Sequence, residues 1–475
     1  MLKESLLPLI IAGLFINSNA HAAVNLIAIG NLTGSSDFSS LSGNLENGMA
    51  ANILGGMGSG LAYAGGNTFL ALPDRGPNAT PYNSAVDDTV SYISRFHTLN
   101  MSLTVNNSGS GLAYNLAPTL VATTLLHSPT ALIYGSGAAA GLPNGNWVND
   151  STHNYFTGRS DNFAPGLSTN PDNGRFDPEG IRVSADGKSV FISDEYGPYV
   201  YQFNRTTGER IKAFTLPGNL SASNLSANGD VEIAGNSVGR VANKGMEGLA
   251  ITPDGTKLVG IMQAPLEQDT NKVVRIVTID IATGATKEYA YQLTSGSGVS
   301  EIVAVNDHTF LIDERDGKGL GDNSSAKGKV LFSVDLAGAQ EIPAGASGDL
   351  SALAVSKSAF IDLKSALVAA GIDAKNIPAK LEGVSFGQDI VENGVIKHTL
   401  YVTNDNDFLN TITDSNHPAG FANPNQFYVF SFTDADLPGY MPQAISAVPE
   451  PESFAMMLAG LGLMGFVARR RSKAA

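Results

Sequence analysis

Acidic residues recur at matching points of short repeated strand pairs, and they are the side chains of this sequence best suited to chemistry. Each of four segments opens on a Glu, continues through an apolar strand, a turn and a second apolar strand, and closes on acidic or polar residues. The opening residues are Glu179, Glu247, Glu301 and Glu382. The closing residues of interest, one of them from a fifth copy, are Asp74, Glu195, Glu314 and Asp405.

These two sets of acids are expected on one rim, because the start of the first strand in an antiparallel hairpin lies beside the end of the second. Convergent carboxylates raise each other's pKa unless cations neutralise them. A hard divalent metal would do so, and oxygen ligands in a chain without cysteine favour Ca²⁺, with Mg²⁺ or Mn²⁺ next. The sequence therefore predicts a metal site. The alternative is structural, with Glu bonding to backbone groups and the following Gly allowing close strand entry.

Three arginines stand beside these acids and are the candidates for binding a substrate phosphate: Arg75, Arg182 and Arg315. A guanidinium can hold a phosphate through two parallel hydrogen bonds. The alternative for each arginine is simple neutralisation of its acidic neighbours. No catalytic residue is assigned beyond these candidates.

The repeated segments predict an all-β fold, a β-propeller. Asp-Gly turns between the strands, as at 186–187 and 254–255, are typical of hairpins. Five blade repeats are counted, including a degenerate copy at Ser59 without the leading Glu, and the gap from Ser59 to Glu179 leaves six or seven blades open. One short helical insertion is expected within 351–370, and strands at 24–29 and 427–432 are expected to close the ring. A β-sandwich is the alternative, but it leaves the recurrence unexplained.

Both ends of the chain carry export signals. Residues 1–22 have a Lys, an apolar stretch and Ala-His-Ala, which predicts a signal peptide. Residues 447–475 contain Pro-Glu-Pro, an apolar run at 453–468 and three arginines, an order that resembles the PEP-CTERM sorting signal of Gram-negative bacteria. That resemblance implies a transmembrane helix at 453–468 in the inner membrane, processing by an exosortase, and delivery to the cell surface or extracellular matrix. The propeller domain is then 23–446.

Composition excludes several classes of function. The net charge of −15 and pI near 4.8 argue against nucleic-acid binding, and the absence of cysteine excludes disulfides and thiol nucleophiles. None of the six histidines within 23–446 stands beside a repeat-end acid in a triad-like arrangement, which disfavours a serine carboxylesterase.

Six short motifs resemble the phytase-like family, described by the esterase-like activity of phytase, and they lie in order at 74–78, 177–180, 193–198, 245–249, 311–316 and 403–408. The resemblance implies a β-propeller and a hydrolase of ester bonds, and the calcium dependence of propeller phytases agrees with the acidic rim. We therefore expect an exported metal-dependent hydrolase of phosphoester or ester substrates, the phosphoesterase being favoured. The alternative is a non-catalytic binding protein of the matrix or cell surface.

Overall fold

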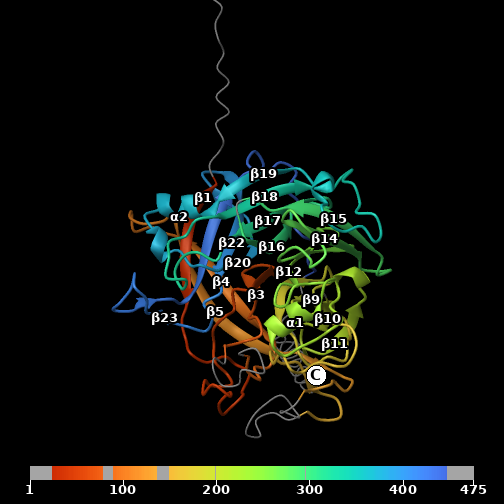
Figure 1. Ribbon diagram of the computed structural model, residues 1–475. Coiled ribbons are helices and arrows are strands. Elements are labelled where there is room, and N and C mark those ends of the chain that lie inside the picture. Colours follow the sequence, from red (N-terminus) through yellow and green to blue (C-terminus); the bar gives the residue numbers. More distant parts are fainter. Residues whose placement is uncertain (1–23, 79–88, 136–148, 198, 295, 447–475) are drawn as a thin grey trace, which may run out of the picture.

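The described part of the computed structural model comprises residues 24–78, 89–135, 149–197, 199–294 and 296–446. The predicted signal peptide and the tail with its apolar run at 453–468 lie outside these residues. Within them, five four-stranded antiparallel blades surround one axis (Figure 1). This count confirms the propeller and the five repeats. The gap after Ser59 holds the long hairpin of the first blade and, among its described residues, no sixth blade.

Each of the first four blades is one continuous stretch of chain. Blade 1 comprises β2 (Gly60–Tyr63), β3 (Thr68–Leu72), β4 (Arg95–Val105) and β5 (Tyr114–Leu125). Blade 2 comprises β8 (Pro178–Val183), β9 (Ser189–Asp194), β10 (Tyr199–Asn204) and β11 (Arg210–Phe214). Blade 3 comprises β12 (Met246–Ile251), β13 (Lys257–Met262), β14 (Val273–Asp280) and β15 (Thr286–Gln292). Blade 4 comprises β16 (Gly298–Ala304), β17 (Thr309–Arg315), β18 (Lys329–Asp335) and β19 (Lys357–Asp362).

Blade 5 is built from both ends of the domain. Its strands are β20 (Leu381–Phe386), β22 (Val395–Asn404), β25 (Asn425–Phe432) and, outermost, β1 (Asn25–Leu32), with β21 (Ile390–Glu392) paired to the start of β22. The pairing of β1 with β25 runs from Asn25 opposite Ser431 to Leu32 opposite Asn425. The predicted closure of the ring is thus confirmed. Small two-stranded pairs outside the blades are β6 (His127–Ser128) with β7 (Asn154–Tyr155), and β23 (Thr411–Ile412) with β24 (Phe421–Ala422).

Helices are few among the described residues. The expected helical insertion at 351–370 contains a 3-10 turn (Ser351–Leu353), then strand β19, and only then α2 (Leu363–Ala369), so part of it belongs to blade 4. Asp362 caps α2 by accepting a hydrogen bond from the Ser365 amide. A second helix, α1 (Gly229–Gly235), and 3-10 turns at Gly218–Leu220 and Ala374–Asn376 lie in loops.

The first strand of every blade lies nearest the axis, where β2, β8, β12, β16 and β20 contact one another in a ring. Glycine permits this close approach. A Cβ on Gly180 would lie 2.7 Å from the Leu249 amide nitrogen, and one on Gly60 would lie 2.4 Å from the Glu179 carbonyl oxygen. The structural role expected for Gly after the opening Glu is therefore present, because adjacent inner strands touch at that position.

Candidate metal centre

The inner strands can be compared position by position, because each carries one apolar residue that belongs to a different core cluster. These equivalent residues are Leu61, Ile181, Leu249, Ile302 and Val384. The residues two positions before them lie at one end of the axis, which we call the acidic end. They are Ser59, Glu179, Glu247, Ser300 and Glu382. Three blades thus present Glu at the opening position, and blades 1 and 4 present Ser.

This register corrects the expected equivalence of Glu301 with the other opening residues. Blades 3 and 4 share a β-bulge at this point, after which Gly248 lies opposite Ile261 in blade 3 and Glu301 lies opposite Asp313 in blade 4, so Glu301 takes the position at which the other inner strands have Gly. A shift of one residue turns a strand side chain to the opposite face. Glu301 accordingly accepts hydrogen bonds from the Leu249 and Ile302 amides at 3.1 and 2.9 Å and pairs with Arg182 at 3.0 Å, away from the rim.

A second ring of side chains follows the second strand of each blade. In blades 2 to 5 the residue before the opening position pairs with a residue near the end of the second strand, which is Asp194, Met262, Glu314 and Asn404 in turn. The residue that follows each of these in the sequence therefore occupies an equivalent position in its blade. These residues are Glu195, Gln263, Arg315 and Asp405. In blade 1, Asp74 follows β3 by two residues.

Glu314 is not brought to the rim, because successive side chains of β17 point to opposite faces. Its carboxylate accepts hydrogen bonds from the Tyr291 hydroxyl at 2.9 Å and the Gly296 amide at 2.8 Å, and it pairs with Lys357 at 2.5 Å. Its neighbour Arg315 takes the rim position instead.

Arg182 also lies below the rim, near the middle of the axis. It is buried, and its guanidinium donates to the carbonyls of Leu61 at 2.8 Å and Ile302 at 2.9 Å, so it joins the inner strands of blades 1, 2 and 4. Glu301 supplies its counter-charge. These contacts occupy the donors that a phosphate would need.

Four buried acids of blades 2 and 3 form what we call the carboxylate cluster: Asp177, Glu179, Glu195 and Glu247. Ligand atoms of the first three lie within 4.8 Å of one another. Asp194 fixes this geometry by accepting hydrogen bonds from the Asp177 and Tyr196 amides, both at 3.0 Å. Among the described residues, one buried oxygen of Glu195 has no hydrogen-bond partner. Such an oxygen, aimed among other carboxylates, suits a cation.

The carboxylate cluster has little positive charge of its own. Arg75 donates to Asp177 through its backbone amide at 3.0 Å and its guanidinium at 2.9 Å, and Gln263 donates to Glu247 at 2.9 Å. Burial, followed by the nearby acids, raises the pKa of Glu179 and of Glu247 well above the usual range. Burial and Asp177 raise the pKa of Glu195 to about 7.

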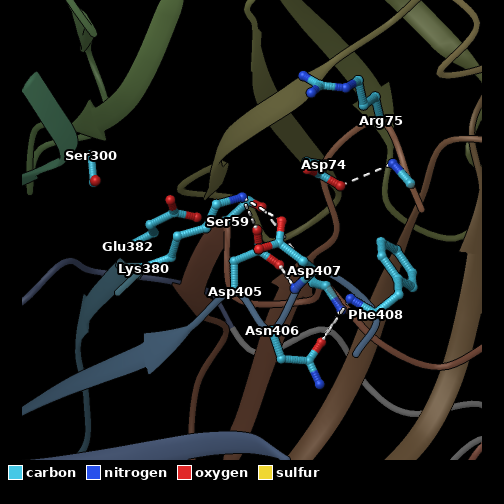
Figure 2. Close-up of polar contacts among 12 residues, drawn as sticks. Ser59, Asp74, Arg75, Ser300, Lys380, Glu382, Asp405, Asn406, Asp407 and Phe408 are labelled. Atoms are coloured by element: carbon cyan, nitrogen blue, oxygen red, sulfur yellow. Dashed lines mark hydrogen bonds and ion pairs between the residues drawn. The ribbon is translucent and has the colours of Figure 1, made fainter. Parts of the chain in front are cut away.

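Across the acidic end lies what we call the lysine cluster: Lys380, Glu382, Asp405 and Asp407. The Lys380 ammonium bonds to Asp405 at 2.8 Å and to Asp407 at 2.6 Å (Figure 2). Arg315 pairs with Glu382 and donates to the Ser300 hydroxyl. Burial would lower the pKa of Lys380, but Asp405 and Asp407 outweigh it, and the pKa is raised well above normal.

The loop after β22 is strained, and its strain aims Asp407 at Lys380. Asp407 and Phe408 have φ values of 49° and 59°, in the left-handed region that non-glycine residues rarely adopt. The buried Asn406 holds the turn by accepting hydrogen bonds from the Gly56 amide at 2.8 Å and the Phe408 amide at 3.1 Å. Figure 2 shows Asp405 and Asp407 on the same side of this turn, facing Lys380.

Asp74 lies between the two clusters. Its carboxylate accepts a hydrogen bond from the Gly76 amide at 2.9 Å. Burial raises its pKa to about 7, while Lys380 and Asp177 act on it in opposite directions. The acidic end thus brings together Asp74, Glu179, Glu195, Glu247, Glu382 and Asp405 of the predicted acids, and it leaves out Glu301 and Glu314.

The profile of the phytase-like family, described as the esterase-like activity of phytase, matches residues 52–408, which span all five inner strands. This chain belongs to that family. The PEP-CTERM protein-sorting motif matches residues 447–471, outside the described residues. In the part of the chain that the structure describes, no helix is long and apolar enough to cross a membrane.

Other similarities are more distant. A protein of Arthroderma benhamiae described as an uncharacterized secreted protein is 33% identical over 135 residues, which cover only 24% of this chain and 26% of the relative. The sorting motif supports export of the phytase-like propeller. Two solved structures, hydrazine synthase of Kuenenia stuttgartiensis and a 6-phosphogluconolactonase candidate of Bacteroides uniformis, are 10% and 12% identical. They cover 74% and 79% of this chain and 78% and 88% of their own chains, and both have a TM-score of 0.28.

Sequence reasoning missed two residues of the acidic end as site residues, Asp177 and Lys380. Both stand two residues before an opening Glu, in the pattern Asp-Pro-Glu-Gly and Lys-Leu-Glu-Gly. A comparison of this position between repeats would have found them.

Proposed function

We propose that this phytase-like propeller is a metal-dependent hydrolase of phosphoester or ester substrates, acting at its acidic end. The observation that carries the proposal is the carboxylate cluster, in which ligand atoms of Asp177, Glu179 and Glu195 lie within 4.8 Å and one buried Glu195 oxygen has no hydrogen-bond partner among the described residues. Buried like charges at this spacing are stable only when protonated or when a cation joins them.

The donor set fits a hard cation. Oxygen ligands alone suit Ca²⁺, with Mg²⁺ or Mn²⁺ as alternatives. Asp177, Glu179 and Glu195 would hold the ion, and Glu247 would remain beside it with its hydrogen bond from Gln263. An ion bound there would polarise a substrate oxygen and lower the pKa of a bound water.

The residues of the chain itself would bind and orient the substrate. Arg315 and Lys380 stand across the acidic end, with side chains 14% and 33% exposed. Arg75, at 20%, stands beside Asp177. A phosphate bridging the two clusters would exchange the carboxylate partners of Arg315 or Lys380 for its own oxygens. Arg182 and Glu301 would support the inner strands without touching the substrate.

A non-catalytic cation-binding protein of the cell surface is the second candidate. It is favoured by the pairing of both exposed cations, since Lys380 already bonds to Asp405 and Asp407, and Arg315 to Glu382. Phosphate must displace these carboxylates, whereas a divalent cation would join the carboxylate cluster beside Arg75, which pairs with Asp177 at 2.9 Å, and Arg315, which lies 3.9 Å from Glu247.

Turnover of p-nitrophenyl phosphate and p-nitrophenyl acetate by the purified protein, with CaCl₂ or with EDTA, separates these functions. We expect phosphate turnover with Ca²⁺, its loss in EDTA and its loss in Glu195→Gln. Glu209→Gln, which changes an exposed carboxylate on the turn after β10, is the matched control and should retain activity. Ca²⁺ binding without turnover of either ester would favour the non-catalytic cation-binding protein over the hydrolase. Acetate turnover in EDTA would exclude metal-dependent chemistry.

A further inference from the structure

The end of the axis opposite the acidic end is closed by a segment that we call the strap, residues 439–446. Its backbone and side chains bond to the ends of two inner strands, β16 and β8. The Met441 amide donates to the Val305 carbonyl at 2.8 Å, Gln443 donates to the Val183 carbonyl at 2.7 Å, and the Ser446 amide donates to the Ala185 carbonyl at 2.8 Å. The strap therefore fixes residue 446 against blade 2, on the face that holds the β8–β9 turn.

The strap is continuous with an exposed apolar hairpin on the same face. Its Tyr440 ring lies 4.6 Å from the rings of both Phe386 and His398, which flank the β21–β22 hairpin. Beyond His398 the strand β22 extends past its partner β25, since the pairing with β25 begins at His398. The projecting part exposes Val391 at 68%, Val395 at 53% and Ile396 at 60%.

Val391 and Ile396 face each other across this hairpin and Val395 adjoins them, and a contiguous exposed apolar patch marks an interaction surface. The sorting motif begins at residue 447, directly after the strap. Only residues 447–452 separate Ser446 from the apolar run that begins at Ser453. Six residues span at most about 20 Å in any conformation, because each residue extends the chain by at most about 3.5 Å.

We infer that the face bearing the strap and the β21–β22 hairpin lies against a lipid bilayer while the tail is uncleaved, with Val391, Val395 and Ile396 in contact with the membrane surface. This inference rests on insertion of the 453–468 run and is independent of the proposed hydrolase activity. The acidic end, at the other end of the axis, then faces away from the membrane and is open to solutes.

Site-specific fluorescence quenching tests this orientation, because the chain has no cysteine and single labels are simple to place. Full-length protein is reconstituted into phosphatidylcholine vesicles that contain nitroxide-labelled phospholipid. One variant carries a dye at Val395→Cys, and the matched control carries it at Val231→Cys on α1, which is 61% exposed in the loop before β12, at the acidic end. We expect at least twofold stronger quenching at position 395. Equal quenching, stronger quenching at 231, or protein that fails to float with the vesicles overturns the inference.

A second comparison tests the hairpin contact itself. Val391→Ser with Ile396→Ser should reduce quenching of the label at 395, whereas Val231→Ser with Ile233→Ser on α1 should leave it unchanged. Quenching that is unaffected by the hairpin changes overturns the lipid contact. Neither comparison measures turnover, so a failure here is distinguishable from a failure of the proposed function.

Discussion

The carboxylate cluster and the lysine cluster are built from equivalent positions of different blades, yet they balance their charge in opposite ways. In blade 2 the position two residues before the opening Glu is Asp177, and in blade 5 it is Lys380. The lysine supplies a cation to Asp405 and Asp407 from within the chain. The aspartate adds a further carboxylate to Glu179 and Glu195. One position of the repeat thus decides whether a blade carries its own counter-ion or requires one from solution.

The comparison also explains which acids respond to a metal. The lysine cluster is stable without any ion, because its carboxylates already have an ammonium and a guanidinium. Burial raises the pKa of acids in both clusters, that of Glu195 to about 7 and those of Glu179 and Asp405 well above the usual range, but Asp405 has the Lys380 ammonium beside it. Metal binding with proton release is therefore expected in blades 2 and 3.

Lys380→Met should have the largest effect, because it leaves Asp405 and Asp407 without their cation. We expect a loss of about 2–3 kcal/mol in the free energy of unfolding at neutral pH in EDTA, less than for a fully buried pair because Lys380 is partly exposed. Added Ca²⁺ should recover part of this loss, since the variant then resembles the carboxylate cluster. Chemical denaturation with and without Ca²⁺ measures both. No loss of stability would show that the lysine cluster is not balanced by Lys380.

The pH dependence of stability should follow the buried acids of the acidic end. Asp74 and Glu195 have folded pKa values of about 7, against ordinary values near 4. Between these values the folded chain holds protons that the unfolded chain has released, so stability is highest at low pH and decreases as pH rises through 7. We expect a loss of about 2–3 kcal/mol for each of the two groups from pH 5 to pH 8 in EDTA, and a smaller loss with Ca²⁺. A flat profile in EDTA would contradict the raised pKa values.

Glu195→Gln should stabilise the metal-free protein by about 1–2 kcal/mol at pH 8, because it removes a buried charge that has too few partners. The same change should abolish the increase in melting temperature on adding Ca²⁺. Glu209→Gln serves again as the control and should preserve that increase. A calcium response that survives in Glu195→Gln would exclude Glu195 as a ligand.

Gln263→Glu is the smallest test. It removes the hydrogen bond to Glu247 and adds a carboxylate at the equivalent position of blade 3. We expect a loss of about 1 kcal/mol in EDTA from the unpaired acid, together with severalfold tighter Ca²⁺ binding by calorimetry. Weaker calcium binding would show that Gln263 positions a ligand and that its hydrogen bond cannot be replaced by charge.

The repeat pattern was sufficient to predict much of the fold. The recurrence of Glu-Gly before an apolar strand identified the inner strands of blades 2, 3 and 5, and the two terminal strands were correctly paired. The error fell on blade 4, where Glu301 lacks the following Gly because it occupies the Gly position itself, opposite Asp313. Aligning Ile302 with the apolar residues Ile181 and Leu249, rather than Glu301 with Glu179, would have predicted the rim residues of blade 4. These are Ser300 at the opening position and Arg315 after the second strand.

The sequence predicted which end of the propeller carries the acids better than it predicted which basic side chains lie beside them. Arg182 stands next to acids in the sequence in the same way as Arg315, but only the structure separates an arginine that bonds to inner-strand carbonyls from one at the rim. Lys380 occupies the position of Asp177 in the repeat, but that position alone does not show which acids its ammonium reaches. Its role depends on the strained turn at Asp407, which brings a loop from the end of β22 to the start of β20.

The pairing of β1 with β25 has a consequence for how the protein is made. Asn25 and Ser431 are about 400 residues apart in the chain, and contacts of such separation form late in folding. If the chain crosses a membrane from its N-terminus, β1 emerges first. Its edge stays unpaired until β25, the strand with which it pairs, has also crossed. Blades 1 to 4 can each fold from contiguous chain as they appear, whereas blade 5 and the closed ring cannot. The ring is therefore a product of completed translocation, and the exposed edge of β1 is where aggregation or chaperone binding is most expected before it closes.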